Sequence, residues 1–118
     1  MSPRNTYILD IDGTIFQHHG NTFSVLYNDS RPLLPGVKKF FDECKEKDHV
    51  IILTTARDDS LIEATEKQIK NAGLWYHAIV YNCTTGQRHI VNDRKEDGAI
   101  TAFGHPIERD SGLENIPR

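Results

Sequence analysis

Three clusters of polar side chains have the residue types that phosphate and metal chemistry require. The first is the carboxylate pair Asp10 and Asp12, the second is Thr54 with Thr55, and the third ends in Asp93. Side chains alternate along an extended chain, so two carboxylates spaced by two residues point the same way. Asp10 and Asp12 can therefore face one reacting atom.

The first and third clusters together have the composition of a magnesium site. A carboxylate about 4 Å from a phosphate dianion meets a repulsion of roughly 8 kcal/mol at an effective dielectric constant near 20, so its attack needs a compensating cation. Asp93 and the pair of Asp10 and Asp12 supply the hard oxygen ligands that magnesium prefers. Gly13 has no side chain to hinder the approach of its backbone to a phosphate.

Each cluster follows an apolar run that is typical of a buried strand. We expect strands over residues 7–11, 50–53, 78–81 and 89–92, with 100–103 as a candidate fifth strand. The carboxyl ends of parallel strands lie at one edge of a sheet. The three clusters should therefore meet there.

Two amphipathic helices are predicted between the strands, over residues 35–47 and 60–72, because apolar residues recur there at helical spacing. Alternating strands and helices predict right-handed crossovers and an α/β fold: a doubly wound parallel sheet with helices on both faces. We expect one domain over residues 1–118. Residues 15–31 have no sustained period and are predicted to be a loop, and the segment after Gly104 is predicted to be peripheral.

In their order along the chain, these motifs resemble the haloacid dehalogenase superfamily. Its first motif, Asp-x-Asp-Gly-Thr, is matched in full by residues 10–14. Its second motif, an apolar strand that ends in Thr or Ser, is matched at Thr55, with Thr54 as the alternative. Its fourth motif is matched by the run that ends at Asp93, with Asp97 four residues later.

The third motif of this superfamily is a lone Lys or Arg, which is weakly defined in any sequence. We select Arg88, four residues before Asn92, and keep Arg94 and Lys95 as alternatives.

The resemblance implies a mechanism. Asp10 attacks phosphorus and forms a phosphoaspartyl intermediate, while Asp12 protonates the leaving oxygen and then activates water. Thr55 and Arg88 hold the phosphate oxygens. Mg²⁺ is bound by Asp10, the backbone carbonyl of Asp12 and Asp93, with Asp97 as a candidate in the outer coordination shell. The further candidate substrate contacts are Gly13, Thr54, Arg57 and His18.

The chain has little room for the inserted caps by which members of this superfamily differ. About 35 residues separate Thr14 from Val50, and the predicted helix uses a third of them. A helix and a strand fill the segment between Thr55 and His89. We therefore expect an open site, unless the loop over 15–31, a partner or a neighbouring subunit in a homo-oligomer covers it.

Composition restricts the class of protein. The net charge of −3, from 17 acidic and 14 basic residues, argues against a general nucleic-acid binder. No apolar run is long enough to span a membrane, and the first residues do not resemble a signal peptide, so the expected compartment is the cytoplasm. Cys44 and Cys83 are expected to be reduced.

The leading hypothesis is a magnesium-dependent phosphomonoesterase that acts on a small phosphorylated sugar or a related metabolite. The main alternative is a nucleotide or polynucleotide end phosphatase, which would need a basic stripe that this sequence lacks. A second alternative, from a different class, is a non-catalytic module that binds magnesium and phosphate.

Overall fold

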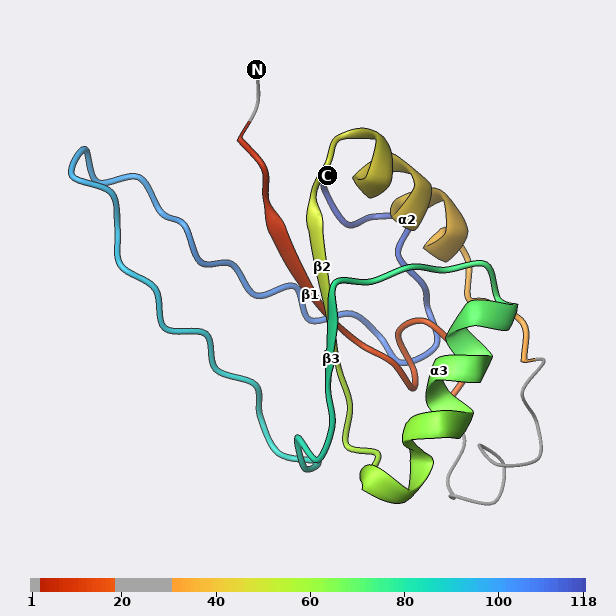
Figure 1. Ribbon diagram of the computed structural model, residues 1–118. Coiled ribbons are helices and arrows are strands. Elements are labelled where there is room, and N and C mark those ends of the chain that lie inside the picture. The colour runs from red at the N-terminus through yellow and green to blue at the C-terminus, as the bar shows by residue number, and fades with distance from the viewer. Residues whose placement is uncertain (1–2, 19–30) are drawn as a thin grey trace.

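The structure is a computed structural model, and it describes residues 3–18 and 31–118 (Figure 1). Most of the loop predicted over 15–31 lies outside these residues. Among the described residues, no helix is both long and apolar enough to cross a membrane. The regular elements are β1 Thr6–Asp10, α2 Val37–Glu46, β2 Val50–Thr54, the 3-10 turn η1 Asp59–Leu61, α3 Ile62–Asn71 and β3 Ala78–Val80.

The three strands form one parallel sheet in the order β1-β2-β3. Asp10 lies opposite Thr54, and Thr54 lies opposite Val80. Helix α2 connects β1 to β2, and helix α3 connects β2 to β3, as parallel pairing requires. The predicted α/β architecture with a parallel sheet is confirmed, and no cap is evident among residues 3–18 and 31–118.

The helices cover only one face of the sheet, which differs from the predicted cover on both faces. Ile51 and Leu53 point to this face and are fully buried. On the opposite face, Ile8 is 46% exposed and Val80 is 49% exposed. Two successive right-handed crossovers in the same direction place both helices on the same side, as Figure 1 shows.

The strands predicted over 89–92 and 100–103 do not form. The chain after β3 instead leaves the sheet as a long arm, which then returns to the rest of the molecule ahead of the C-terminal segment (Figure 1). Its apolar side chains are exposed, with Val91 at 96% and Phe103 at 63%. A strand needs a neighbour that accepts its backbone hydrogen bonds, and in the described part of the chain β1 pairs with β2 alone.

The tip of this arm is a turn with its own hydrogen bonds. The Lys95 N–H donates to the carbonyl oxygen of Ala99 at 3.0 Å. The Thr101 hydroxyl donates to the carbonyl oxygen of Asp93 at 2.7 Å, so the two sides of the arm meet near its end.

The C-terminal segment belongs to the core, which corrects the prediction that it is peripheral. Leu113 is 1% exposed within the main apolar cluster. Its N–H donates to the carbonyl oxygen of Pro35 at 2.9 Å. A Cβ atom added to Gly112, which has a φ of +88°, would lie 2.1 Å from that same oxygen. The close approach of the two backbones therefore requires glycine.

We expect Leu113→Ala to lower the free energy of unfolding by about 3 kcal/mol, because it removes apolar contacts and leaves a cavity. Urea denaturation measures this change. Val91→Ala is the matched control, since Val91 is 96% exposed on the arm, and it should change the free energy by less than about 0.5 kcal/mol. Equal effects of the two variants would contradict a structural role for the C-terminal segment.

Candidate active site

The first motif lies on a compact loop that its own apolar residues anchor. The loop follows Asp10 at the end of β1, and the N–H groups of Ile15 and Phe16 donate to the carbonyl oxygen of Ile11 at 2.9 and 3.2 Å. Ile11, Ile15 and Phe16 are all fully buried. The backbone of Asp12 is thus anchored by buried residues that precede and follow it in the loop.

Both backbone polar groups of Gly13 form hydrogen bonds. Its N–H donates to the carbonyl oxygen of Phe16 at 2.7 Å, and its own carbonyl oxygen accepts from the N–H of Asp110 at 2.8 Å. A Cβ atom at Gly13, where φ is +88°, would lie 3.2 Å from Cγ of Arg109. Gly13 therefore makes room for Arg109, and its N–H is already bonded inside the loop.

Asp12 forms a two-pronged ion pair with Arg57. Nε and Nη2 of Arg57 donate to the two carboxylate oxygens at 2.9 and 2.7 Å. Nη1 donates to Thr65 and Gln68 of α3 at 3.0 and 2.9 Å. The Arg57 side chain is only 4% exposed. Arg57, predicted to contact substrate, instead positions Asp12 against α3.

A second arginine beside Asp12 was not identified from the sequence. Arg31 has a side chain that is 1% exposed, and its Nη1 lies 3.5 Å from an oxygen of Asp12. Nη1 also donates to the carbonyl oxygen of Gln17 at 2.7 Å. Burial lowers the pKa of Arg31, and the charge of Asp12 acts in the opposite direction. Arg31 lies at the end of a segment without periodicity, so nothing in the pattern indicated its burial.

Asp10 faces Arg88. Nη2 of Arg88 lies 4.0 Å from Oδ1 of Asp10, and the two side chains are 38% and 45% exposed. Burial of the carboxylate raises the pKa of Asp10, and the positive charge of Arg88 opposes this shift. Of the three candidates for the third motif, the structure brings Arg88 to Asp10. Its Nη1 donates to the carbonyl oxygens of Cys83, Thr84 and Gly86.

The two threonines of the second motif have different surroundings. Thr54 is the register partner of Asp10 and shares its face of the sheet. Thr55 is 1% exposed, and its hydroxyl accepts the N–H of Arg57 at 3.1 Å. This geometry favours Thr54 over Thr55 as a group that can reach a ligand of Asp10.

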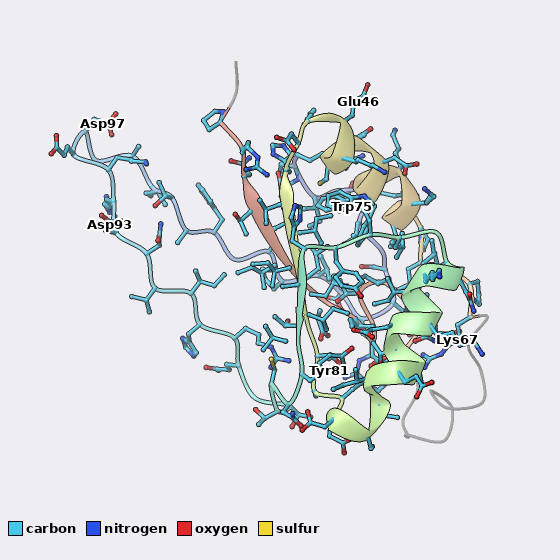
Figure 2. All side chains as sticks on the ribbon, viewed as in Figure 1. Glu46, Lys67, Trp75, Tyr81, Asp93 and Asp97 are labelled. Atoms are coloured by element: carbon cyan, nitrogen blue, oxygen red, sulfur yellow. The ribbon has the colours of Figure 1, made fainter. Side chains whose placement is uncertain are left out.

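The fourth motif lies away from the other clusters. Figure 2 shows Asp93 and Asp97 near the far end of the arm, and both are exposed. Arg88 is at Asp10, and five extended residues span about 17 Å, so the chain carries Asp93 away from the pocket. The described residues contain no group of three or more His, Cys, Asp or Glu side chains that could hold a metal ion. The predicted magnesium ligands do not come together in this arrangement.

The residues of the first motif line a pocket with a volume of about 300 Å³. The C-terminal segment forms one of its walls, although the sequence pattern indicated no role for that segment. His18 lies close to this wall, since its N–H donates to Oδ1 of Asp110 at 2.7 Å. The residues that line the pocket are Asp10, Asp12, Gly13, Thr14, Ile107 and Arg109.

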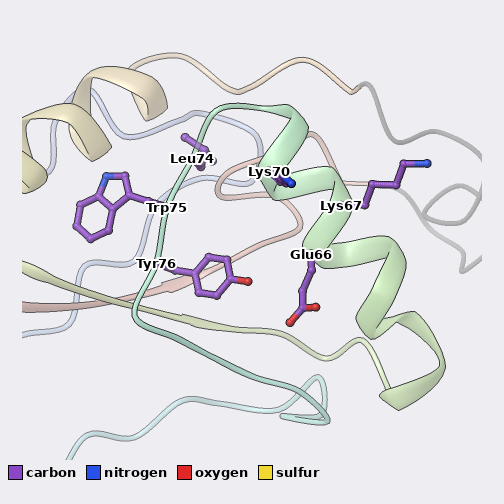
Figure 3. Close-up of a pocket in the computed structure, with 6 residues that line it drawn as sticks. All are labelled: Glu66, Lys67, Lys70, Leu74, Trp75 and Tyr76. Atoms are coloured by element: carbon purple, nitrogen blue, oxygen red, sulfur yellow. The ribbon is translucent and has the colours of Figure 1, made fainter.

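A larger hollow of about 520 Å³ lies between α3 and the segment that follows it (Figure 3). It shares no residue with the pocket at Asp10. Its lining residues are Glu66, Lys67, Lys70, Leu74, Trp75 and Tyr76.

We expect Asp12→Asn to lower the free energy of unfolding by about 3 kcal/mol, as measured by urea denaturation at pH 7. The substitution leaves the buried guanidinium groups of Arg57 and Arg31 without a carboxylate. An unchanged free energy would show that the ion pair does not hold the loop.

Asp10→Asn is the comparison variant and should act in the opposite direction. Because burial raises the pKa of Asp10 above its ordinary value of 3.8, the ionised side chain opposes folding above the raised pKa and has no effect below 3.8. Asn removes this effect. Thermal unfolding should therefore show a higher midpoint for Asp10→Asn at pH 7, and the difference should shrink as the pH falls toward 4.

Several solved structures resemble this chain, and they include two different proteins. A chain of the Pnkp1/Rnl/Hen1 complex matches with a TM-score of 0.58 and 23% identity, over 74% of this chain and 30% of that chain. That assembly is also described as an RNA repair complex. The D,D-heptose 1,7-bisphosphate phosphatase of B. bronchiseptica, complexed with magnesium and phosphate, matches with a TM-score of 0.51 and 21% identity, over 83% of this chain and 55% of that chain.

No protein-family model and no curated protein sequence matches this chain. The chain spans about a third to about half of the length of the solved chains that it resembles. Identities below 25% establish the fold alone. Together with the parallel sheet, they show that the chain shares the α/β fold of these solved chains.

Proposed function

We propose that this chain is a phosphomonoesterase in which Asp10 is the nucleophile. The observation that carries the proposal is a carboxylate at the end of β1 that lines a pocket and has a guanidinium group 4.0 Å away. The likeness in fold to a phosphatase supports it.

Electrostatics favours phosphate binding at this carboxylate. Arg57 and Arg31 already offset the charge of Asp12, so Asp10 is the main source of repulsion toward a phosphate. A phosphate dianion about 4 Å from a single charge interacts by roughly 8 kcal/mol at an effective dielectric constant near 20. Arg88 beside Asp10 therefore offsets a repulsion of about the same size.

The proposed reaction has two displacements. A carboxylate oxygen of Asp10 forms a bond to phosphorus while the ester P–O bond breaks, and the leaving oxygen takes up a proton. Water then attacks phosphorus, which releases inorganic phosphate and restores the Asp10 carboxylate. Arg88 would neutralise charge on the phosphate oxygens in both steps.

Asp12 is proposed to transfer the proton in each step. Both of its oxygens accept hydrogen bonds from Arg57. A proton on this carboxylate needs one oxygen released, so the proposal requires one of the two hydrogen bonds to open during turnover. Arg57 would then hold the other oxygen and keep the carboxyl group in the pocket.

Magnesium is the proposed cofactor. It would supply positive charge at the phosphate, and Asp10 and the backbone carbonyl of Asp12 would bind it. A magnesium ion is present in the heptose bisphosphate phosphatase of similar fold. The resemblance also assigns Asp93 to the metal, which requires a different course of the chain after Arg88.

The proposed substrate is a small phosphorylated sugar or a related metabolite. A volume of about 300 Å³ is at the lower end of small-molecule pockets, so it suits a metabolite better than a long strand. The alternative substrate is a nucleotide or a polynucleotide end. The likeness to a chain of an RNA repair complex favours this alternative, and the net charge of −3 disfavours it.

Phosphate release from sugar phosphates, nucleotides and phosphorylated oligonucleotides tests the proposal. We expect turnover of sugar phosphates that a chelator abolishes and added magnesium restores. Asp10→Asn should lower kcat by at least about a thousandfold, because no covalent intermediate can form. If Asp10→Asn binds phosphate esters as the native protein does and neither protein turns them over, the chain is a binding module.

Substitutions of Arg88 and Asp93 test the course of the chain after Arg88. In the present arrangement, Arg88→Gln should lower kcat/KM by about a hundredfold, whereas Asp93→Asn should change it by less than about twofold. Steady-state kinetics at several magnesium concentrations measures both variants. A large effect of Asp93→Asn that added magnesium relieves would instead place Asp93 on the metal, and Asp97→Asn is the matched control.

A further inference from the structure

The turn that carries Arg109 is fastened to the first-motif loop at two points. The N–H of Asp110 donates to the carbonyl oxygen of Gly13 at 2.8 Å, and the Asp110 carboxylate accepts the N–H of His18 at 2.7 Å. Within the turn, the N–H of Ser111 donates to the carbonyl oxygen of Glu108 at 3.1 Å. The backbone of Arg109 is therefore held beside the pocket.

The side chain of Arg109 lies along the pocket wall. Its Cγ and Cδ atoms lie 3.2 and 3.9 Å from the position that a Cβ of Gly13 would occupy. Arg109 lines the pocket together with Ile107, which comes from the same segment. Within residues 3–18 and 31–118, its guanidinium group forms no hydrogen bond or ion pair.

Arg109 differs in this respect from the other arginines of the site. Arg57 and Arg31 lie against Asp12, and Arg88 lies against Asp10. These three cations face two carboxylates. Arg109 adds a further positive charge on a wall of the pocket where the described residues provide no carboxylate partner.

We propose that Arg109 is a substrate-binding residue that selects phosphomonoesters with a second anionic group. This inference rests on the proposed function, in which Asp10 attacks the reacting phosphate and Arg88 neutralises charge on its oxygens. Arg109 enters from a different wall, next to the apolar side chain of Ile107. That wall suits the carbon skeleton of the leaving group, with a second phosphate or a carboxylate bound by the guanidinium group.

The test compares substrates that differ by the second group. Fructose 1,6-bisphosphate is paired with fructose 1-phosphate, and 3-phosphoglycerate is paired with glycerol 3-phosphate. We expect Arg109→Gln to lower kcat/KM by about ten- to a hundredfold for the doubly anionic member of at least one pair, because it removes a charged hydrogen bond. It should change kcat/KM by less than about threefold for the singly phosphorylated members.

Two further variants accompany this test. Arg109→Lys keeps the charge and should retain part of the preference, although an ammonium group cannot donate the two parallel hydrogen bonds of a guanidinium group. Arg4→Gln is the matched control, because Arg4 pairs with exposed Asp48 before the start of β1. It removes the same charge and should leave every kcat/KM unchanged.

Three outcomes would overturn the proposal. A decrease in kcat/KM of similar size for both members of each pair would mean that Arg109 binds the reacting phosphate. An unchanged kcat/KM for every substrate would mean that Arg109 does not bind substrate. If the native protein hydrolyses none of these compounds, the proposed function fails by itself. The role of Arg109 is then decided by calorimetry, which measures the binding of fructose 1,6-bisphosphate to the native protein and to Arg109→Gln. Binding at least tenfold weaker in Arg109→Gln would sustain the inference, whereas equal or undetectable binding would overturn it.

Discussion

The ion pair between Asp12 and Arg57 is the interaction on which the arrangement of the site depends. It joins the loop after β1 to the turn after β2, and Arg57 extends the connection to Thr65 and Gln68 of α3. A buried ion pair contributes little net stability compared with apolar packing, but the loss of one partner leaves an unpaired buried charge. The pair therefore determines where the first-motif loop sits. Asp10 precedes that loop and faces the same pocket.

The C-terminal segment contributes to both the core and the pocket. Leu113 is buried in the main apolar cluster, and the Tyr7 hydroxyl donates to the carbonyl oxygen of Pro117 at 3.1 Å. A few residues earlier, Asp110 is bonded to the first-motif loop and Arg109 lines the pocket. Because one continuous segment does both, the packing of Leu113 also sets the position of the Arg109 turn. Stability and ligand binding are coupled through the backbone of this segment.

Helices α2 and α3 both lie on one face of the sheet (Figure 1), and this has consequences for the site. Asp10 points to the same face as Ile8, two residues earlier, so neither α2 nor α3 covers it. The arm beyond Arg88 carries exposed apolar side chains, of which Val91 is the most exposed at 96%. Within residues 3–18 and 31–118, the side chains that can contact a ligand are those of the pocket walls, so these side chains determine the selectivity of the pocket.

The sequence by itself determined the three strands of the sheet, the two helices and the position of the Asp10 motif at the end of a strand. These features follow from local periodicity and from residue types at fixed spacing, which do not depend on distant parts of the chain. The same reasoning predicted a strand over 89–92 that does not form, because a strand exists only where a neighbouring edge accepts its hydrogen bonds. Arg31 and Arg109 were not identified, since their positions depend on contacts between segments far apart in sequence. Only the tertiary structure decided that Arg57 faces Asp12 rather than a ligand, because one guanidinium group fits a solvent-exposed phosphate or a buried carboxylate equally well.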